Sequence, residues 1–362
     1  MSSKEQVSET TSSAIMQMAT GFWVSKTLMT AVELDIFTKI SSYQTDKDAG
    51  SITLKKFQEI VGIREHRPAE AFTTALVSLG LLRTKKDKKG EKTFVNTELS
   101  SEFLDRSKPT YIGDVIEMFD QRLYKRWDRL SEALTTNEPV GEKQGEDIES
   151  IFDRARSNEE AKQIQKFTRA MHGISIGPAM ALARTVDFSK YKKMMDIGGG
   201  SGVYAIQVVA KNPGKMSAVV LDSKPVCQVA KDYIQQFKLQ DKVQTIEFDF
   251  FNDPMPQDCD VAFLSHIIHI FDKDKNMALL KRIHESLPNE KGMIIISEWL
   301  LNDEKTGPVA SALMGLTMII ENRGGRSYSY DEVSQMLREA GFKDIEKKLL
   351  IEPAEIIIGY KE

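Results

Sequence analysis

A run of glycines directly after a short apolar segment is the feature that most constrains this chain. Residues 194–197 are apolar except for Asp196, and glycines follow at positions 198, 199, 200 and 202. The segment 203–210 then has helical spacing of apolar residues. Glycine permits positive φ angles and close approach of a ligand to the backbone, and a helix start offers unpaired N–H groups. The pattern predicts a buried strand, a tight turn and a helix N-terminus that together form a nucleotide-type pocket.

The spacing within this turn separates two classes of nucleotide-binding protein. The glycines follow a G-x-G-x-G pattern, because Val203 stands where the dinucleotide fingerprint G-x-G-x-x-G has its last glycine. This departure argues against NAD. A nicotinamide oxidoreductase therefore stays a minor alternative.

The C-terminal half alternates predicted strands and helices, which indicates a parallel sheet covered on both faces. The expected strands are 194–197, 216–221, 243–248, 260–264 and 293–297, and the expected helices are 203–210, 226–237, 274–287 and 331–340. Two further strands, 344–351 and 354–360, are separated by only Glu352 and Pro353. Two residues are too few for a crossover connection, so these last strands should pair antiparallel.

The pattern of the N-terminal part predicts a winged helix. Apolar residues recur at helical spacing over 14–40, short helices are expected at 53–62 and 69–79, and the segments 81–84 and 93–96 flank a charged glycine-containing turn. Such an arrangement raises the question of DNA binding. The segment in the recognition-helix position, 69–82, contains no Lys or Arg, and residues 1–110 hold 16 basic and 14 acidic side chains. Phosphate binding needs clustered cations, so contact between subunits or substrate closure is the favoured role.

The composition further limits the kinds of protein and partner that fit this chain. The 362 residues are 41% hydrophobic with a net charge of −4, which gives no broad basic field for nucleic acid. Two cysteines cannot form a disulfide framework, and no apolar run approaches the roughly 20 residues that span a bilayer. We therefore expect a cytoplasmic protein without membrane or nucleic-acid partners and without a metal. The predicted organisation is a disordered tail (1–13), a winged-helix-like domain (14–107), a helical connector and substrate wall (108–185) and a ligand-binding α/β domain (186–362).

Polar residues stand where the predicted strands stop. Asp222 lies 24 residues after Gly198, at a strand end where a carboxylate can accept both hydroxyls of a ribose. Asp249 and Phe250 end the next strand and suit the edge and face of an adenine. His269 and Glu298 follow later strands. The carboxyl edge of the sheet is thus predicted to hold a nucleoside-like ligand.

The order and spacing of these motifs resemble those of the class I S-adenosylmethionine-dependent methyltransferases of the small-molecule O-methyltransferase family. The resemblance covers roughly residues 14–362. The matching stretches are 195–202, 221–222, 249–251, 268–272, 296–298 and 324–326 with 339–342. The resemblance implies a Rossmann-like class I methyltransferase sheet with an antiparallel C-terminal hairpin, plus a mainly helical N-terminal winged-helix-like dimerisation domain. It also implies a homodimer.

The resemblance assigns roles to individual residues. The cofactor-binding set it implies is Gly198, Gly200, Gly202, Asp222, Asp249, Phe250, Ser265 and Phe271. It makes His269 the general base and Glu298 the acid that orients it. An imidazole is suited to this role, because a phenol with a pKa near 10 is mostly protonated at neutral pH and must lose its proton to attack.

Two departures from the family pattern bear on the reaction. The family commonly has His-Asp-Trp where this chain has His269-Ile270-Phe271, and Ser327 stands where plant members have a second acid. His269 is therefore left with one orienting carboxylate in place of two. Methylation of nitrogen or carbon, which has little need for a base, stays an alternative to O-methylation. A cofactor-sensing DNA-binding regulator is the alternative from another class.

The acceptor is expected to be a small aromatic or polyketide-like molecule held in an apolar pocket. The residues proposed to line that pocket are Phe119, Phe167, Met171, His172, Met314 and Met318. Each of them is as consistent with plain core packing.

Overall fold

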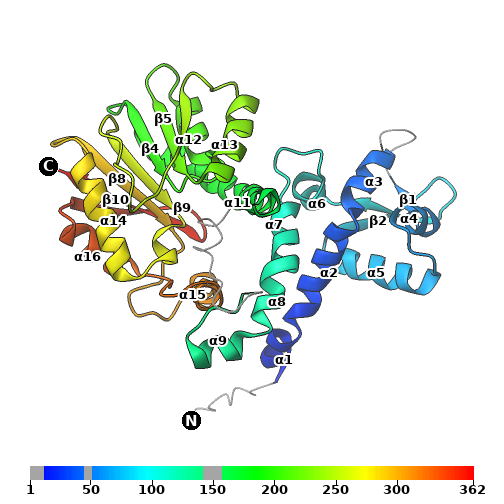
Figure 1. The fold of residues 1–362 in the computed structure, drawn as a ribbon. Helices are drawn as coiled ribbons and strands as arrows, with labels where there is room; N and C mark the ends of the chain where they lie inside the picture. The colour runs from blue at the N-terminus through cyan, green and yellow to red at the C-terminus, as the bar shows by residue number, and fades with distance from the viewer. Residues whose placement is uncertain (1–11, 45–50, 142–156) are drawn as a thin grey trace, which may run out of the picture. The chain divides into compact units, whose positions relative to one another are not determined.

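The structure is a computed structural model that describes residues 12–44, 51–141 and 157–362 (Figure 1). It contains two compact units, residues 1–120 and 121–362, and each is considered by itself. The predicted tail lies outside the described residues except for its last two positions, and the first helix begins at Ser13. Within the described part, no helix is both long and apolar enough to cross a membrane.

The N-terminal unit consists of helices around a small antiparallel sheet with the strand order β1-β3-β2. Its elements are α1 (Ser13–Ala19), α2 (Gly21–Glu33), α3 (Ile36–Gln44), β1 (Ile52–Thr53), α4 (Leu54–Val61), α5 (His66–Ser78), β2 (Leu82–Lys86), β3 (Lys92–Asn96), α6 (Glu98–Phe103) and α7 (Gly113–Met118). The hydroxyl of Thr53 caps α4, and Gly62 ends that helix with a φ of 85°. The predicted helices and hairpin are present. The strand β1 is too short to be read from the sequence.

Within the helical connector, the sequence predicts regular helices at 111–119 and 123–134, and the structure is less regular than that. After α7, the π-helical turn η1 (Phe119–Leu123) leads into α8 (Tyr124–Trp127), and α9 (Leu130–Thr136) follows a break. A π-helical turn widens the hydrogen-bonding step, so apolar spacing of 3.6 residues cannot reveal it. Arg122 and Arg126 from this segment both reach the buried carboxylate of Glu321.

The C-terminal unit is built on a seven-stranded sheet with the order β6-β5-β4-β7-β8-β10-β9 (Figure 1). The strands are β4 (Lys193–Ile197), β5 (Ser217–Asp222), β6 (Val243–Glu247), β7 (Val261–Ser265), β8 (Gly292–Glu298), β9 (Lys343–Ile351) and β10 (Ala354–Lys361). The first five run parallel, and β10 pairs antiparallel with both β8 and β9. This topology confirms the predicted fold, including the antiparallel hairpin at the C-terminus.

Helices cover both faces of this sheet. They are α11 (Asn158–Thr185), α12 (Val203–Lys211), α13 (Lys224–Gln236), α14 (Lys273–Ser286) and α16 (Tyr330–Glu339), with the 3-10 turn η2 (Ile268–Ile270) between β7 and α14. The helix α15 (Val309–Glu321) instead contacts α8 and α9. Alternating strand residues divide between two buried clusters, one packed with α11, α12 and α13 and the other with α14 and α16. The carboxyl ends of the parallel strands lie at one edge of this two-faced core, which is where ligands bind in open α/β sheets.

Candidate active site

The glycine-rich turn after β4 has the backbone that the sequence predicts. Gly198, Gly200 and Gly202 have φ angles of 65°, 57° and 72°, a region that other residues rarely adopt. A Cβ atom at Gly198 would lie 2.3 Å from the Cδ1 of Ile267, whereas one at Gly200 would meet no atom within 4 Å. The turn is therefore packed on the side of Gly198 and open at Gly200. That open side allows a ligand to approach the main chain, as an S-adenosylmethionine site requires.

Asp222, the last residue of β5, stands directly beside this turn. Its Oδ2 accepts a hydrogen bond from the Gly200 N–H at 3.0 Å, and its Oδ1 accepts one from the Ser223 N–H at 2.7 Å. Burial raises the pKa of the Asp222 carboxyl to about 6, although these two N–H groups oppose the shift. Each carboxylate oxygen keeps a free lone pair, so the group can still accept the two hydroxyls of a ribose.

Asp249 and Phe250 follow β6 and close a tight loop. The carboxylate of Asp249 accepts hydrogen bonds from the Asn252 side chain at 2.8 Å and from the backbone N–H groups of Phe251 and Asn252, and these bonds lower its pKa. The ring of Phe250 lies 3.3 Å from the position of a Cβ at Gly198. Asp249 thus caps its own loop, while the Phe250 ring borders the glycine turn.

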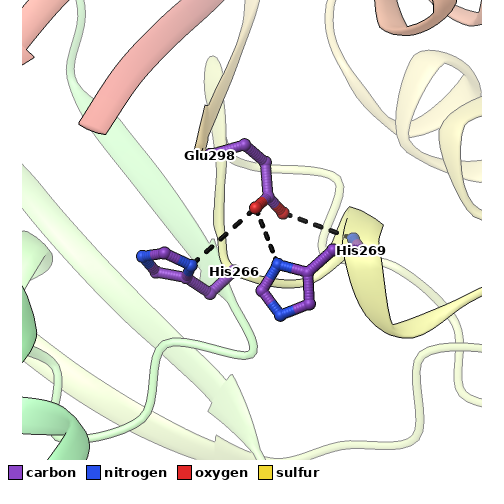
Figure 2. Close-up of side chains that lie close together, drawn as sticks. All are labelled: His266, His269 and Glu298. Atoms are coloured by element: carbon purple, nitrogen blue, oxygen red, sulfur yellow. Dashed lines mark hydrogen bonds and ion pairs between the residues drawn. The ribbon is translucent and has the colours of Figure 1, made fainter. Parts of the chain in front are cut away.

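His269 and Glu298 form a buried pair at the neighbouring strand ends (Figure 2). His269 lies in η2, which a two-residue loop joins to β7, and Glu298 is the last residue of β8. The His269 Nδ1 is 2.7 Å from the Glu298 Oε2, and the backbone N–H of His269 donates to Oε1 at 3.4 Å. Burial opposes ionisation of Glu298, yet the charge and hydrogen bonds of His269, together with the charge of His266, hold its pKa below the usual value. The carboxylate is therefore charged at neutral pH and directs the Nε2 of His269 away from itself.

His266 is a third member of this group that the sequence did not single out. Its Nδ1 is 3.8 Å from the Glu298 Oε2, and its ring is 5.4 Å from that of His269 (Figure 2). The residue has a φ of 57°, in the left-handed region, and its N–H donates to the Ser297 carbonyl at 3.1 Å. Burial lowers the pKa of the His266 imidazole to about 4. The sequence could have indicated His266 through one pattern, the two histidines three residues apart after a predicted strand.

The backbone of His269 is held from behind by the segment 324–326. Its carbonyl accepts the Arg326 N–H at 2.9 Å, and a Cβ at Gly325 would lie 2.9 Å from the same oxygen. The buried hydroxyl of Ser327 donates to the Ser311 carbonyl at 2.7 Å, so it is directed toward α15. This segment supports the position of His269 without adding a second acid to it.

Two further residues of the implied cofactor set have other partners. The Ser265 Oγ lies 3.1 Å from the Tyr204 hydroxyl. The Phe271 ring is 4% exposed and meets Phe251 edge to face at 5.2 Å, as part of the core under α14. Most of the Phe271 ring is thus already covered by the protein itself.

The predicted acceptor-pocket residues are distributed over three places. Phe119 lies in the N-terminal unit, Phe167, Met171 and His172 lie on α11, and Met314 and Met318 lie on α15. The His172 Nδ1 is 2.8 Å from the Oγ of Ser201, in the glycine-rich turn, and its ring stacks on Tyr233 at 3.9 Å. His172 therefore contacts the cofactor side of the site.

Two acids after neighbouring strands, a glycine turn and a buried His–Glu pair on this sheet order define a class I methyltransferase. Family models agree: the O-methyltransferase domain matches residues 127–343, and the O-methyltransferase dimerisation domain matches residues 16–106. The chain belongs to the O-methyltransferase family and is an S-adenosylmethionine-dependent enzyme, as the sequence predicted.

Individual relatives cover nearly the whole chain. The tetracenomycin polyketide synthesis 8-O-methyl transferase TcmO of Streptomyces glaucescens is 31% identical over 347 residues, 96% of each chain. The 3-hydroxy-5-methyl-1-naphthoate 3-O-methyltransferase of Streptomyces sahachiroi is 30% identical over 350 residues, 96% of this chain and 94% of its own. The structure of human N-acetylserotonin methyltransferase in complex with SAM has a TM-score of 0.85 at 25% identity, with 100% and 99% of the two chains covered.

Proposed function

We propose that the enzyme transfers a methyl group to a hydroxyl of a small aromatic or polyketide-like metabolite, with His269 as the general base. The observation that carries this proposal is the buried His269–Glu298 pair, 2.7 Å apart at the carboxyl edge of the sheet. The relatives named for polyketide and naphthoate O-methylation support the acceptor class. S-adenosylmethionine supplies an electrophilic methyl group on a sulfonium sulfur.

The role of each residue follows from proton transfer. Glu298, held charged, accepts the Nδ1–H of His269 and so fixes the tautomer in which Nε2 carries a lone pair. Nε2 takes the proton of the acceptor hydroxyl as the oxygen attacks. The imidazolium formed is then stabilised by the same carboxylate. General-base catalysis of this kind contributes about 10²- to 10⁴-fold.

The cofactor is proposed to lie over the glycine turn. Gly198, Gly200 and Gly202 would border its methionine end, and Asp222 would accept the ribose hydroxyls. Phe250 would contact the adenine face, and Asp249 would meet the adenine edge with lone pairs that its loop leaves free. Ser265 and Phe271 would complete this site.

The acceptor is proposed to lie beside the residues 171–178 of α11, each of which is partly exposed. In that segment Met171 offers a flexible apolar surface for a flat ligand. Met314 on α15 is also partly exposed, whereas Met318 is buried.

The test is methyl transfer to a panel of phenolic acceptors by wild type and His269→Ala. We expect the variant to lose at least about 100-fold in kcat. Its affinity for S-adenosylhomocysteine, measured by calorimetry, should stay within a few-fold of wild type. Near-full turnover by His269→Ala would overturn the role of the base, and would favour a nitrogen or carbon acceptor that needs none.

The enzyme is also proposed to be a homodimer formed through the dimerisation domain. Large apolar side chains on α1 and α2 are exposed, with Met18 at 80% and Trp23 at 63%. A second copy of the chain would remove this surface from water. Sedimentation of the purified protein should give twice the chain mass, and Trp23→Glu should shift it toward the monomer. A monomeric wild type would refute the proposal.

A further inference from the structure

The side chains of His266, His269 and Glu298 are arranged so that they could bind a metal ion. One ligand atom from each residue lies within 4.8 Å of the other two. Two imidazoles and a carboxylate are a donor set that suits borderline divalent ions such as Zn²⁺, Co²⁺ and Ni²⁺. We propose that this group binds one Zn²⁺ ion, and that the bound ion inhibits methyl transfer.

The three ligands are held by backbone contacts that do not depend on an ion. The N–H of His266 is tied to the Ser297 carbonyl, which immediately precedes Glu298. The carbonyl of His269 is tied to the Arg326 N–H. Glu298 comes from β8, His269 from η2 and His266 from the loop between β7 and η2. Their side chains face one another in Figure 2. Such preorganisation lowers the entropic cost of gathering the ligands around an ion.

The distances match a zinc ion after a small adjustment. Zinc binds nitrogen and oxygen at about 2.0–2.2 Å in tetrahedral geometry, so two of its ligand atoms lie about 3.3–3.6 Å apart. The His266 Nδ1 and Glu298 Oε2 are 3.8 Å apart and must approach each other slightly. The His269 Nδ1 and Glu298 Oε2 are 2.7 Å apart and must separate by at least about half an ångström. That separation accompanies a change of tautomer: the proton leaves Nδ1, whose lone pair goes to zinc, and Nε2 takes up a proton from water, so the imidazole stays neutral.

An ion can reach the group from solvent. The His266 side chain is 20% exposed and that of His269 is 11% exposed, so neither ring is sealed in the core. A fourth position is left for water.

A zinc ion at this position would inhibit methyl transfer. This inhibition rests on the proposed function, in which His269 is the general base. Coordination of the His269 Nδ1 removes the Nδ1–H···Glu298 bond that orients the base. The carboxylate is shared with the ion and no longer stabilises the imidazolium. Zinc binding and proton abstraction by His269 therefore exclude each other.

The test measures binding directly. Chelator-treated full-length protein is titrated with ZnCl₂ by calorimetry, and with CoCl₂ by visible absorption, since Co²⁺ reports nitrogen coordination in its d–d bands. We expect one equivalent for wild type and at least a tenfold weaker affinity for His266→Asn, whose side chain tolerates the left-handed backbone. His66→Asn, which removes an exposed imidazole in the other unit, should bind as wild type does. His266→Gly is the second variant if the first melts at a lower temperature.

Several results would overturn the site: no saturable binding, equal affinity in wild type and both His266 variants, or loss of binding in His66→Asn. Failure of the site and failure of the proposed function are distinguishable. Methyl transfer measured in chelator tests the function alone. If transfer occurs, Zn²⁺ at its measured Kd should halve the wild-type rate, while each His266 variant should keep its own metal-free rate at that concentration.

Discussion

The Oδ2 of Asp222 accepts the backbone N–H of Gly200 at 3.0 Å, so the acid that ends β5 braces the turn that ends β4. The two groups belong to adjacent parallel strands, whose register pairs Ile197 with Leu221. One carboxylate thus both fixes the shape of the turn and faces the space where a ribose would lie. Changing it should affect cofactor binding more than overall stability.

Asp222→Asn should weaken binding of S-adenosylhomocysteine by about 10- to 100-fold. The amide offers one acceptor oxygen in place of two, and hydrogen bonds to a charged group contribute about 1.5–3 kcal/mol. Calorimetric titration measures the effect. Asp241→Asn, which changes an exposed acid in the turn between α13 and β6, is the matched control and should bind normally. Equal Kd values for the two variants would remove Asp222 from the ribose site.

The affinity for the cofactor should also fall in acid. The pKa of Asp222 is raised to about 6 by burial, so below that pH a bound proton occupies the group that should accept the ribose hydroxyls. Affinity is then flat above about pH 7 and declines by up to about tenfold per pH unit below about pH 6. Titrations of wild type and Asp222→Asn over that range measure the slope. The variant should have the flatter profile, because the amide that replaces the carboxyl does not titrate; parallel profiles would assign the slope to another group.

Glu298→Gln should lower kcat by about 10²- to 10³-fold while leaving the cofactor Kd within a few-fold. Glutamine keeps the shape but loses the charge that stabilises a protonated His269, and its amide can select the wrong tautomer. Single-turnover methyl transfer measures the rate. Glu247→Gln, at the partly solvated edge strand β6, provides the comparison for loss of one carboxylate. Full activity in Glu298→Gln would show that His269 needs no anionic partner.

Gly325→Ala tests the support behind His269. The new methyl group would lie 2.9 Å from the His269 carbonyl oxygen and 3.0 Å from that of Ile270, and backbone oxygens cannot rotate away. Overpacking of this kind costs about 1–3 kcal/mol, and here it should also displace η2 and reduce kcat. Thermal melting and turnover are measured together. Gly177→Ala in α11, where a Cβ meets nothing within 4 Å, should keep or raise stability; it is the control for thermal melting alone, because residues 171–178 border the proposed acceptor site. An unchanged kcat in Gly325→Ala would mean that η2 adapts.

The sequence predicted those parts of the site that depend on neighbouring residues. The turn at 198–202 is local, because strand hydrophobicity, glycines and the following helix lie within about fifteen residues. Asp222 could be placed because a parallel strand order brings successive strand ends to one edge.

Long-range side-chain contacts could not be predicted in the same way. The approach of His266 to Glu298 joins residues 32 positions apart and depends on a left-handed φ at a histidine, which no periodicity reveals. The contact of His172 with Ser201 depends on how α11 packs over the turn. Phe271 was assigned from a family position, yet tertiary packing covers most of its ring. Side-chain environments of this kind are properties of the packed core.

Asp196 shows how the same core affects stability. This carboxyl, on the second-last residue of β4, is 1% exposed, and burial raises its pKa to about 7, aided by the charge of Asp222 and opposed by the Ala205 N–H. The unfolded chain releases this proton near pH 3.8. Between that pH and about pH 7 the folded state holds a proton that the unfolded state has lost, so the free energy of unfolding falls as pH rises through this window.

Asp196→Asn removes this titration while keeping the size of the side chain. The variant should therefore gain stability relative to wild type as pH rises from about 5 to about 8, with a difference on the order of 2–4 kcal/mol at the upper end. Urea denaturation midpoints of both proteins at the two pH values measure it. Lys and His groups elsewhere titrate equally in both proteins and cancel in the comparison. A difference that stays constant with pH would mean that Asp196 is ionised in the folded enzyme, with its charge compensated within the glycine turn.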